Sequence, residues 1–202
     1  LTAAAGTAFK APTFNDLYLD YPPFYFSNPD LKPEKSRSAE IGLSYAAAGQ
    51  WLQLTAFASE TRDMIVIDPV SFATTVNLDE GRNRGLELAW NGRLAGLDAR
   101  AALTLQNPED AGSGQALLRR AQRYGSFALS ERIGKFGWRA ELIASGPHPD
   151  VHVANFSRVS VPGYASLNLS GDYAIGRDWK LGARVLNALD ADYALVHGYA
   201  TP

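Results

Sequence analysis

The side chains that most invite a chemical interpretation are two histidines four residues apart, in the run His148-Pro-Asp-Val-His152. Imidazole is a common metal ligand, and on a helix this spacing would place both rings on one face. On a strand or in a loop the same spacing does not bring the rings together, and a ligand set needs more than two groups. We therefore expect exposed loop histidines and no metal site.

No other motif predicts catalysis or a bound cofactor. The 202 residues contain no nucleophile elbow, phosphate-binding loop or dinucleotide fingerprint, and the absence of cysteine excludes thiolate zinc sites and cysteine nucleophiles. The acidic pairs Asp79-Glu80 and Glu109-Asp110 are too sparse for the roughly six to eight oxygen ligands of calcium. With 19 basic and 21 acidic residues, the chain lacks the positive charge typical of nucleic-acid binding. We expect no enzyme, no cofactor and no nucleic-acid partner.

The elements that position these side chains have a period of two. Apolar and polar residues alternate through seven stretches, each of which predicts a strand with one apolar and one polar face. The stretches are 37–45, 52–63, 83–91, 97–106, 138–145, 166–173 and 179–185. The segment 121–132 is ambiguous, with Phe127 and Leu129 marking its apolar side. No useful length has helical periodicity, so the sequence predicts an all-β chain of about nine antiparallel strands.

Two features favour a membrane β-barrel over a soluble β-sandwich, which alternation alone does not separate. Trp51, Trp90, Trp138 and Trp179 all lie beside a short turn, where a membrane interface collects amphipathic rings, although Trp51 has the parity of the polar face. Short turns also alternate with longer loops, as in outer-membrane barrels, and we expect the short turns on the periplasmic side. The turns lie near 46–50, 91–96, 133–137 and 175–178, and the loops near 10–35, 68–75, 107–118 and 146–160.

The alternation also assigns side chains to the two faces of the barrel wall. We expect lipid contact for Leu54, Leu88, Leu103, Leu142 and Leu169, and lumen contact for Thr55, Glu87, Thr104, Glu141 and Asn168. An odd number of strands leaves an unpaired edge, which is costly in lipid, whereas bacterial single-chain barrels have even numbers. We therefore expect residues 1–202 to be part of a longer barrel, with at least one closing strand missing.

Several motifs resemble the barrel of TonB-dependent outer-membrane receptors, and together they span nearly the whole chain. FKAPTFNDLY (Phe9 to Tyr18) and NPDLKPEKS (Asn28 to Ser36) resemble the paired boxes of that family. LDEGRNRGLEL (Leu78 to Leu88) resembles its NEGxxNRGLEL-like segment, VPGYASLNLS (Val161 to Ser170) its penultimate hairpin, and VLNALDADY (Val185 to Tyr193) its NLFDxxY motif. The resemblance implies an outer-membrane, plugged barrel of about 22 strands, of which residues 1–202 are the C-terminal part. It places the plug domain, the TonB-contacting box and the calcium-binding loops upstream.

Within this family, two segments most resemble cobalamin receptors, namely ALLRRAQR (Ala116 to Arg123) and ALVHGYATP (Ala194 to Pro202). The resemblance implies active uptake of cobalamin, with Arg119, the first arginine of the LLRR stretch, reaching the bound corrinoid. The alternation opposes this role: if Phe127 and Leu129 face lipid, Arg120 and not Arg119 points to the lumen. The objection does not hold if the strand begins after Arg119. The simpler alternative is that both arginines are charges at the rim that face lipopolysaccharide phosphates or water and do not contact the ligand.

Siderophore receptors are the main alternative, because aromatic loops suit a catecholate as well as a corrinoid. The loop between Lys10 and Lys35 holds five aromatic residues that could stack on either ligand, although packing within the loop is the simpler expectation. They are Tyr18, Tyr21, Phe24, Tyr25 and Phe26. The same loop contains no histidine, which disfavours a haem receptor. A passive porin and a soluble β-sandwich binding module complete the alternatives.

Overall fold

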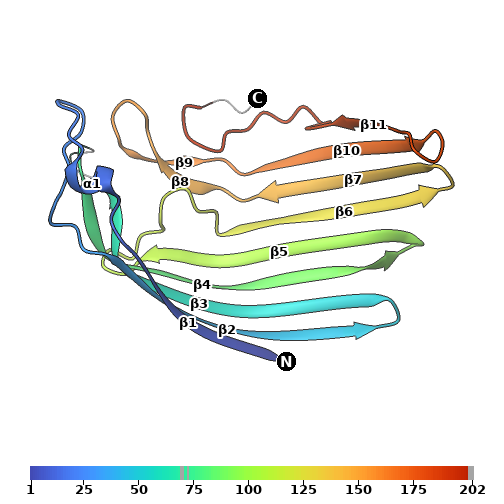
Figure 1. The fold of residues 1–202 in the computed structure, drawn as a ribbon, viewed down its shortest axis with the longest axis horizontal. Helices are drawn as coiled ribbons and strands as arrows, with labels where there is room; N and C mark the ends of the chain where they lie inside the picture. The colour runs from blue at the N-terminus through green and yellow to red at the C-terminus, as the bar shows by residue number, and fades with distance from the viewer. Residues whose placement is uncertain (69–70, 72, 200–202) are drawn as a thin grey trace.

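The computed structural model describes residues 1–68, 71 and 73–199, which are built almost wholly from antiparallel strands (Figure 1). In chain order the elements are β1 (Thr2–Lys10), α1 (Phe14–Tyr18), β2 (Glu34–Ala47), β3 (Gln50–Ile67), β4 (Thr75–Leu94), β5 (Leu97–Asp110), β6 (Arg123–Ile133), β7 (Phe136–Ser145), β8 (His148–Val151), β9 (Arg158–Val161), β10 (Tyr164–Ala174) and β11 (Lys180–Val185). Nine strands form one sheet in the order β1-β2-β3-β4-β5-β6-β7-β10-β11, while β8 and β9 pair only with each other. The predicted all-β class is confirmed, and the predicted number of about nine strands matches the large sheet, to which β8 and β9 are an addition. Within the described residues, no helix is long and apolar enough to span a membrane.

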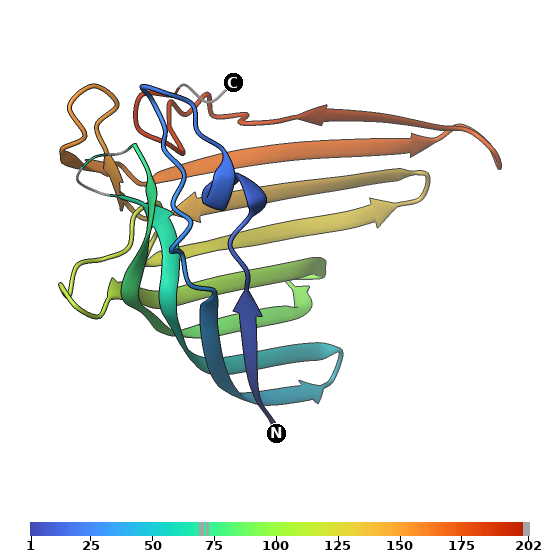
Figure 2. The same ribbon diagram turned by 60° about the vertical axis from the view of Figure 1, so that its left-hand side comes forward.

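The nine-stranded sheet is a single curved layer with β1 and β11 at its edges (Figure 2). Buried apolar side chains are few among the described residues: Leu31, Ala99, Pro108, Ala128 and Val161. A β-sandwich packs the inner faces of two large sheets into a shared core, and the described part of the chain has no second sheet of that size. The soluble-sandwich alternative is therefore excluded.

Strand pairing confirms the predicted alternation of the two faces. Leu54 of β3 lies opposite Leu88 of β4, which lies opposite Leu103 of β5. One position along each strand, Glu87 of β4 pairs with Thr55 of β3 on one side and with Thr104 of β5 on the other, and all three occupy the other face. The leucine face is exposed, with 43% of both Leu54 and Leu103 accessible. A wide exposed apolar face of this kind requires an apolar surrounding.

The two rims of the sheet differ as the sequence predicts. At one rim, the short-turn rim, Ala48-Gly49 joins β2 to β3 and Ala95-Gly96 joins β4 to β5, all with the positive φ that type I′ hairpins need. The turns after β6 and β10 lie at the same rim (Figure 1). The long connections 11–33, 111–122 and 146–163, and the described ends of the connection between β3 and β4, lie at the opposite rim, the long-loop rim. Trp51 pairs with Ala46 in an unbroken register, which confirms that its side chain shares the polar face.

Some boundaries differ from the sequence-based expectation. Strand β5 continues to Asp110 because the long β4 supplies pairing partners, including Asn83 opposite Pro108, so the expected loop at 107 begins only at residue 111. The expected loop 146–160 contains the β8–β9 hairpin. The five residues of α1 form one helical turn, which a capping box of Thr13 and Asp16 stabilises. The strands β8 and β9 and the turn α1 are too short to show a period in the sequence.

Candidate ligand-binding site at the long-loop rim

A buried carboxylate, Asp150 of β8, joins three segments of the long-loop rim. They are the loop 111–122 after β5, the connection 146–163 that contains β8 and β9, and the C-terminal segment 194–199, together named the rim cluster (Figure 1). Asp150 Oδ1 accepts hydrogen bonds from Arg119 Nε at 2.9 Å and from the Val151 amide at 2.8 Å. Its Oδ2 accepts from the His197 amide at 2.8 Å. With no exposed surface, Asp150 is the internal link of the cluster.

The surroundings of Asp150 favour its charged form. Burial on its own would raise the pKa of this carboxyl, because a charge loses hydration there. The His197 amide, the Arg119 guanidinium and the Val151 amide outweigh burial, and together they hold the pKa of Asp150 below its ordinary value. At neutral pH the rim cluster is therefore held by an ionised carboxylate.

Further contacts fix the loop that carries the two arginines. The Arg119 amide donates to the Pro149 carbonyl at 2.7 Å, so backbone as well as side chain ties this residue to β8. The Arg158 guanidinium of β9 donates to the Ala116 carbonyl three residues earlier in the loop. The loop is therefore attached to both strands of the hairpin.

The expectation of exposed loop histidines is wrong for His148, which belongs to β8, whereas His152 follows β8 and is partly exposed. His148 is buried, and its Nε2 donates to the Leu195 carbonyl at 3.2 Å. The ring of His152 lies 4.8 Å from the ring of His197. His148 is buried, and His152 is partly covered, because the β8–β9 hairpin packs against the C-terminal segment. Over the described ranges, no three His, Cys, Asp or Glu side chains converge as a metal site.

Arg119 lies in the loop and not in the strand, because β6 begins only at Arg123. Its φ of +57° departs from strand geometry, so the parity that opposed a ligand contact does not apply to it. Its side chain is 56% exposed, and Asp150 is its one ion-pair partner among the described residues. A guanidinium has five N–H donors, of which Nε–H is used here. Arg120 is exposed and has no ion pair within the described part of the chain.

The first long loop is anchored to the β3–β4 hairpin by the NPDLKPEKS box. Asn28 Nδ2 donates to the Thr75 carbonyl at 2.9 Å. Asn77 exchanges two hydrogen bonds with the Lys32 backbone, at 2.8 and 2.9 Å, and Leu31 is buried beside them. The box therefore shapes the rim.

The aromatic residues of this loop pack partly on one another and remain open on their outer sides. The rings of Tyr21 and Phe24 stack with centroids 6.1 Å apart, and Tyr18 contacts Phe14 at 5.2 Å. Tyr18, Tyr21 and Phe24 are nevertheless 61%, 67% and 71% exposed. The expected packing is present, and ring surface remains available for a flat ligand.

The VLNALDADY segment has a structural role that brings the C-terminal segment to the rim cluster. Asn187 has a φ of +51°, receives a hydrogen bond from Ala191 and donates one to it, at 3.1 and 3.0 Å. Tyr193 stacks on Tyr164 with centroids 4.2 Å apart. Together with the hydrogen bond from the Ala188 amide to the Leu167 carbonyl, these contacts keep the chain beside β10 after β11 ends. Of the ALVHGYATP stretch, residues 200–202 lie outside the described residues.

Comparison with known families gives one match along most of the chain. The family model described as TonB dependent receptor-like, beta-barrel, matches residues 1–188. Among curated proteins, the vitamin B12 transporter BtuB of Vibrio vulnificus is 31% identical over 198 residues, with 96% of this chain and 31% of the relative covered. The vitamin B12 transporter BtuB of Photobacterium profundum is 28% identical over 205 residues, covering 98% and 33%. The chain spans about a third of the length of these relatives.

Solved structures share the fold. The copper transporter OprC superposes with a TM-score of 0.76 at 22% identity, over 95% of this chain and 31% of that protein. The ferric enterobactin receptor PfeA of Pseudomonas aeruginosa superposes with a TM-score of 0.75, also at 22% identity, over 94% and 32%. At these identities the likeness concerns the fold and not the ligand.

Proposed function

The chain belongs to the TonB-dependent receptor-like β-barrel family, and on that premise we propose that the complete protein is an active uptake receptor for cobalamin. It is an outer-membrane protein, and its strands are part of a transmembrane barrel. The observation that carries the cobalamin assignment is the 31% identity to a vitamin B12 transporter across 96% of this chain. The family consists of transporters and receptors, and we assign no catalytic residue or cofactor.

Residues 1–202 are proposed to be the C-terminal part of the barrel, with the plug domain and the segment that contacts TonB upstream. The long-loop rim is proposed to face outside, and energy coupling through TonB would release the bound ligand through the barrel. The outer-membrane lipid and lipopolysaccharide are then the neighbours of its apolar face.

Arg119 is the proposed ligand contact. Asp150 holds the Nε edge of its guanidinium, while the Nη nitrogens have no ion-pair partner among the described residues. Those N–H groups suit the amide oxygens of corrinoid side chains, and a side chain already held in place loses little freedom on binding. Neighbouring Arg120 has no such support and is the natural comparison.

A ferric siderophore is the second candidate, favoured by one observation. The exposed rings of Tyr18, Tyr21 and Phe24 lie on the loop at the same rim, and they suit stacking on a catecholate. A haem receptor is disfavoured, because the loop from Lys10 to Lys35 contains no histidine that could bind the haem iron.

Titration of the complete receptor with cobalamin, and separately with a ferric catecholate, tests the proposed function. Arg119→Ala should weaken cobalamin binding by about 1–3 kcal/mol, the cost of losing a charged hydrogen bond, which is roughly a 5- to 150-fold rise in Kd. Arg93→Ala is the matched control, since Arg93 forms an exposed ion pair with Asp98 at the short-turn rim.

Arg119→Ala also removes the ion-pair partner of Asp150, so loss of binding could come from a lost ligand contact or from a disturbed rim cluster. The variant Asp150→Asn keeps Arg119 and separates these two effects. A direct contact predicts a larger loss of affinity in Arg119→Ala than in Asp150→Asn. Equal losses would make Arg119 a positioning residue, an unchanged Kd in Arg119→Ala would remove it from the site, and no binding by the unmutated receptor would refute cobalamin itself.

A further inference from the structure

Charged side chains gather on the polar, lumen-facing side of the sheet near the short-turn rim, and we name them the luminal basic band. One row of paired positions crosses the sheet there, from Arg93 through Asp98, Ser130, Arg139 and Ser170 to Arg184. Asp98 lies on the same face of β5 as Thr104, so the whole row faces the lumen. Further charged residues lie on this face within four residues of the row. In all, the band has six cations, Arg93, Arg100, Arg132, Arg139, Lys180 and Arg184, and three carboxylates, Asp98, Glu141 and Asp172.

The positive charge is confined to one part of the wall and to one face. At the level of Arg100, the lumen-facing residues of β4, β3 and β2 are uncharged, namely Asn91, Trp51 and Ala46. The neighbouring outward row is apolar and runs through Leu129, Ala140, Leu169 and Val185. The band is therefore directed at whatever fills the lumen beside β5 to β11, and not at the membrane.

Ion pairs within the band engage all three carboxylates and leave two arginines over. The pairs are Asp98 with Arg93 at 3.3 Å, Glu141 with Arg139 at 2.7 Å, and Asp172 with Arg132 at 2.8 Å and with Lys180 at 3.0 Å. The two that remain, Arg100 of β5 and Arg184 of β11, are exposed, and neither has an ion pair within the described part of the chain. Their full sets of N–H donors are open to another acceptor.

Each of these two arginines borders a hollow in the lumen wall. Arg100 lines a cavity of about 470 Å³ together with Trp51 and Asn91. Arg184 lines a cavity of about 260 Å³ together with Asn168 and Ser170. Each hollow thus combines one guanidinium without an ion pair and neighbouring polar groups, which suits an inserted acidic side chain.

We infer that the luminal basic band docks an acidic face of the plug domain, with carboxylates of the plug at Arg100 and Arg184. That a plug lies upstream belongs to the proposed function, on which this inference rests; the new element is the charge of the plug surface that faces β5 to β11 near the short-turn rim. An arginine that is enclosed by protein and left unpaired is costly, whereas a carboxylate can accept two parallel hydrogen bonds from its guanidinium.

The length of the relatives leaves room for such an occupant. The chain spans about a third of the curated proteins that it matches, so a complete protein of that length has ample sequence for a domain inside the barrel. The excess of cations over carboxylates then selects an acidic surface over a basic one, because like charges facing each other would repel. The contact is separate from the rim cluster and holds for either transported ligand.

The test uses the complete receptor in detergent, with hydrogen exchange of the plug read by mass spectrometry. The double variant Arg100→Gln/Arg184→Gln should raise exchange about tenfold in plug peptides that carry Asp or Glu, since charged hydrogen bonds are lost there. It breaks no ion pair of the described residues, so the barrel should fold and its strands should keep their protection.

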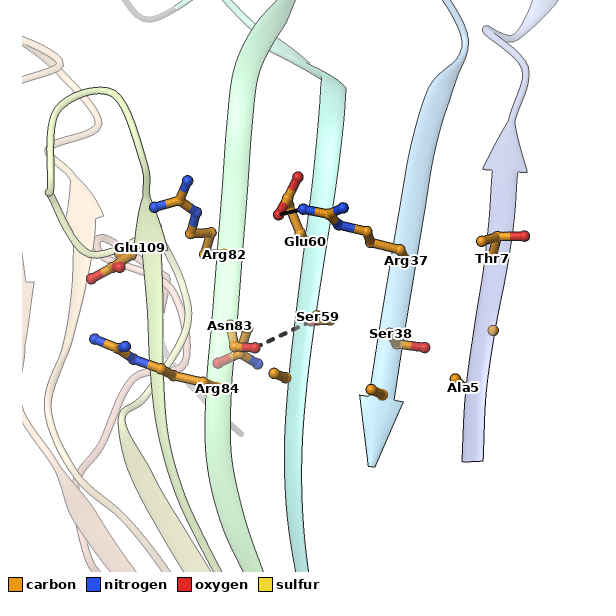
Figure 3. A pocket seen from close by; sticks show the side chains of 13 residues that line it. Ala5, Thr7, Arg37, Ser38, Ser59, Glu60, Arg82, Asn83, Arg84 and Glu109 are labelled. Carbon is orange, nitrogen blue, oxygen red and sulfur yellow. Dashed lines mark hydrogen bonds and ion pairs between the residues drawn. The ribbon is translucent and has the colours of Figure 1, made fainter. Parts of the chain in front are cut away.

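Arg84→Gln is the matched control. Arg84 is also exposed and without an ion pair among the described residues, but it lies on the outward face of β4 with Leu86 and Leu88. Figure 3 shows it apart from the pair that Arg37 and Glu60 form. Plug exchange in this variant should equal that of the unmutated receptor.

A photoreactive amino acid in place of Arg100 or Arg184 tests the contact itself, and should cross-link to plug peptides that carry Asp or Glu. Cross-links only to other peptides, or unchanged plug exchange in the double variant, would overturn the docking. Cobalamin uptake that falls in the double variant while plug exchange stays unchanged would also overturn it, because the arginines would then serve the phosphodiester of the passing corrinoid. Cobalamin affinity at the long-loop rim, measured on the same samples, reports separately on the proposed function.

Discussion

Replacing Asp150 with asparagine should loosen the rim cluster at one identifiable bond. The two oxygens of Asp150 serve different donors: Oδ1 accepts from Arg119 and Val151, and Oδ2 from His197. Asparagine has a single acceptor oxygen, which belongs at the position shared by Arg119 and Val151 because two donors converge there. Its NH₂ group then faces the His197 amide, donor against donor, and that hydrogen bond is lost.

The size of the effect follows from the kinds of bonds involved. An amide hydrogen bond to a buried carboxylate is worth about 1.5–3 kcal/mol. The Arg119 ion pair adds little, since its guanidinium is 56% exposed and screened by solvent. At about 1.4 kcal/mol per factor of ten, protection of the His197 amide from hydrogen exchange should fall roughly 10- to 150-fold.

Hydrogen exchange of the complete receptor, read by mass spectrometry with residue-level fragmentation, measures this directly. Protection at His197 should fall much more than protection at Val151. The control is Asp98→Asn, which removes an ion pair at 3.3 Å between groups that are both about two-thirds exposed and should change exchange very little. Unchanged protection of the His197 amide in Asp150→Asn would refute the role given to this carboxylate.

Three further predictions concern pH, the membrane face and orientation. Because the pKa of Asp150 is lowered in the folded state, its contribution to stability is complete above the ordinary aspartate pKa of about 4 and is lost as the pH falls through the folded value. Hydrogen exchange at the His197 amide, corrected for the intrinsic rate, should therefore be constant from about pH 7 to 5 and rise below about pH 4. Leu103→Arg should cost about 2–4 kcal/mol of folding free energy in lipid vesicles and Thr104→Arg much less; equal costs would contradict the assigned faces. A cysteine at Ser113 should react with an impermeant label on intact cells and one at Gly92 should not, and the reverse result would invert the orientation.

The strands and their faces could be predicted from the sequence because period-two alternation is local and repeated in each strand. Residues such as Leu103 and Thr104 can be assigned to a face of the sheet without knowing which residues they pair with. The alternation of short turns and long loops, with tryptophans beside the turns, extends the same logic to the whole sheet.

The rim cluster could not be predicted in this way, because its contacts join residues far apart in the chain. Asp150 and His197 are 47 positions apart, and nothing in the run His148-Pro-Asp-Val-His152 shows that the aspartate is the buried group. The charged residues that share one level of β2, β3 and β4 are an intermediate case. Arg37, Glu60 and Arg82 are visible as charges in amphipathic strands, but only the register shows that they share a level and the apolar face.

The most direct test of the proposed function is uptake of radiolabelled cobalamin by cells whose only candidate receptor is the complete protein. We expect saturable uptake that requires both the receptor and TonB, and that excess unlabelled cobalamin suppresses whereas a ferric catecholate does not. Accumulation of the ferric catecholate with no uptake of cobalamin would contradict the assignment.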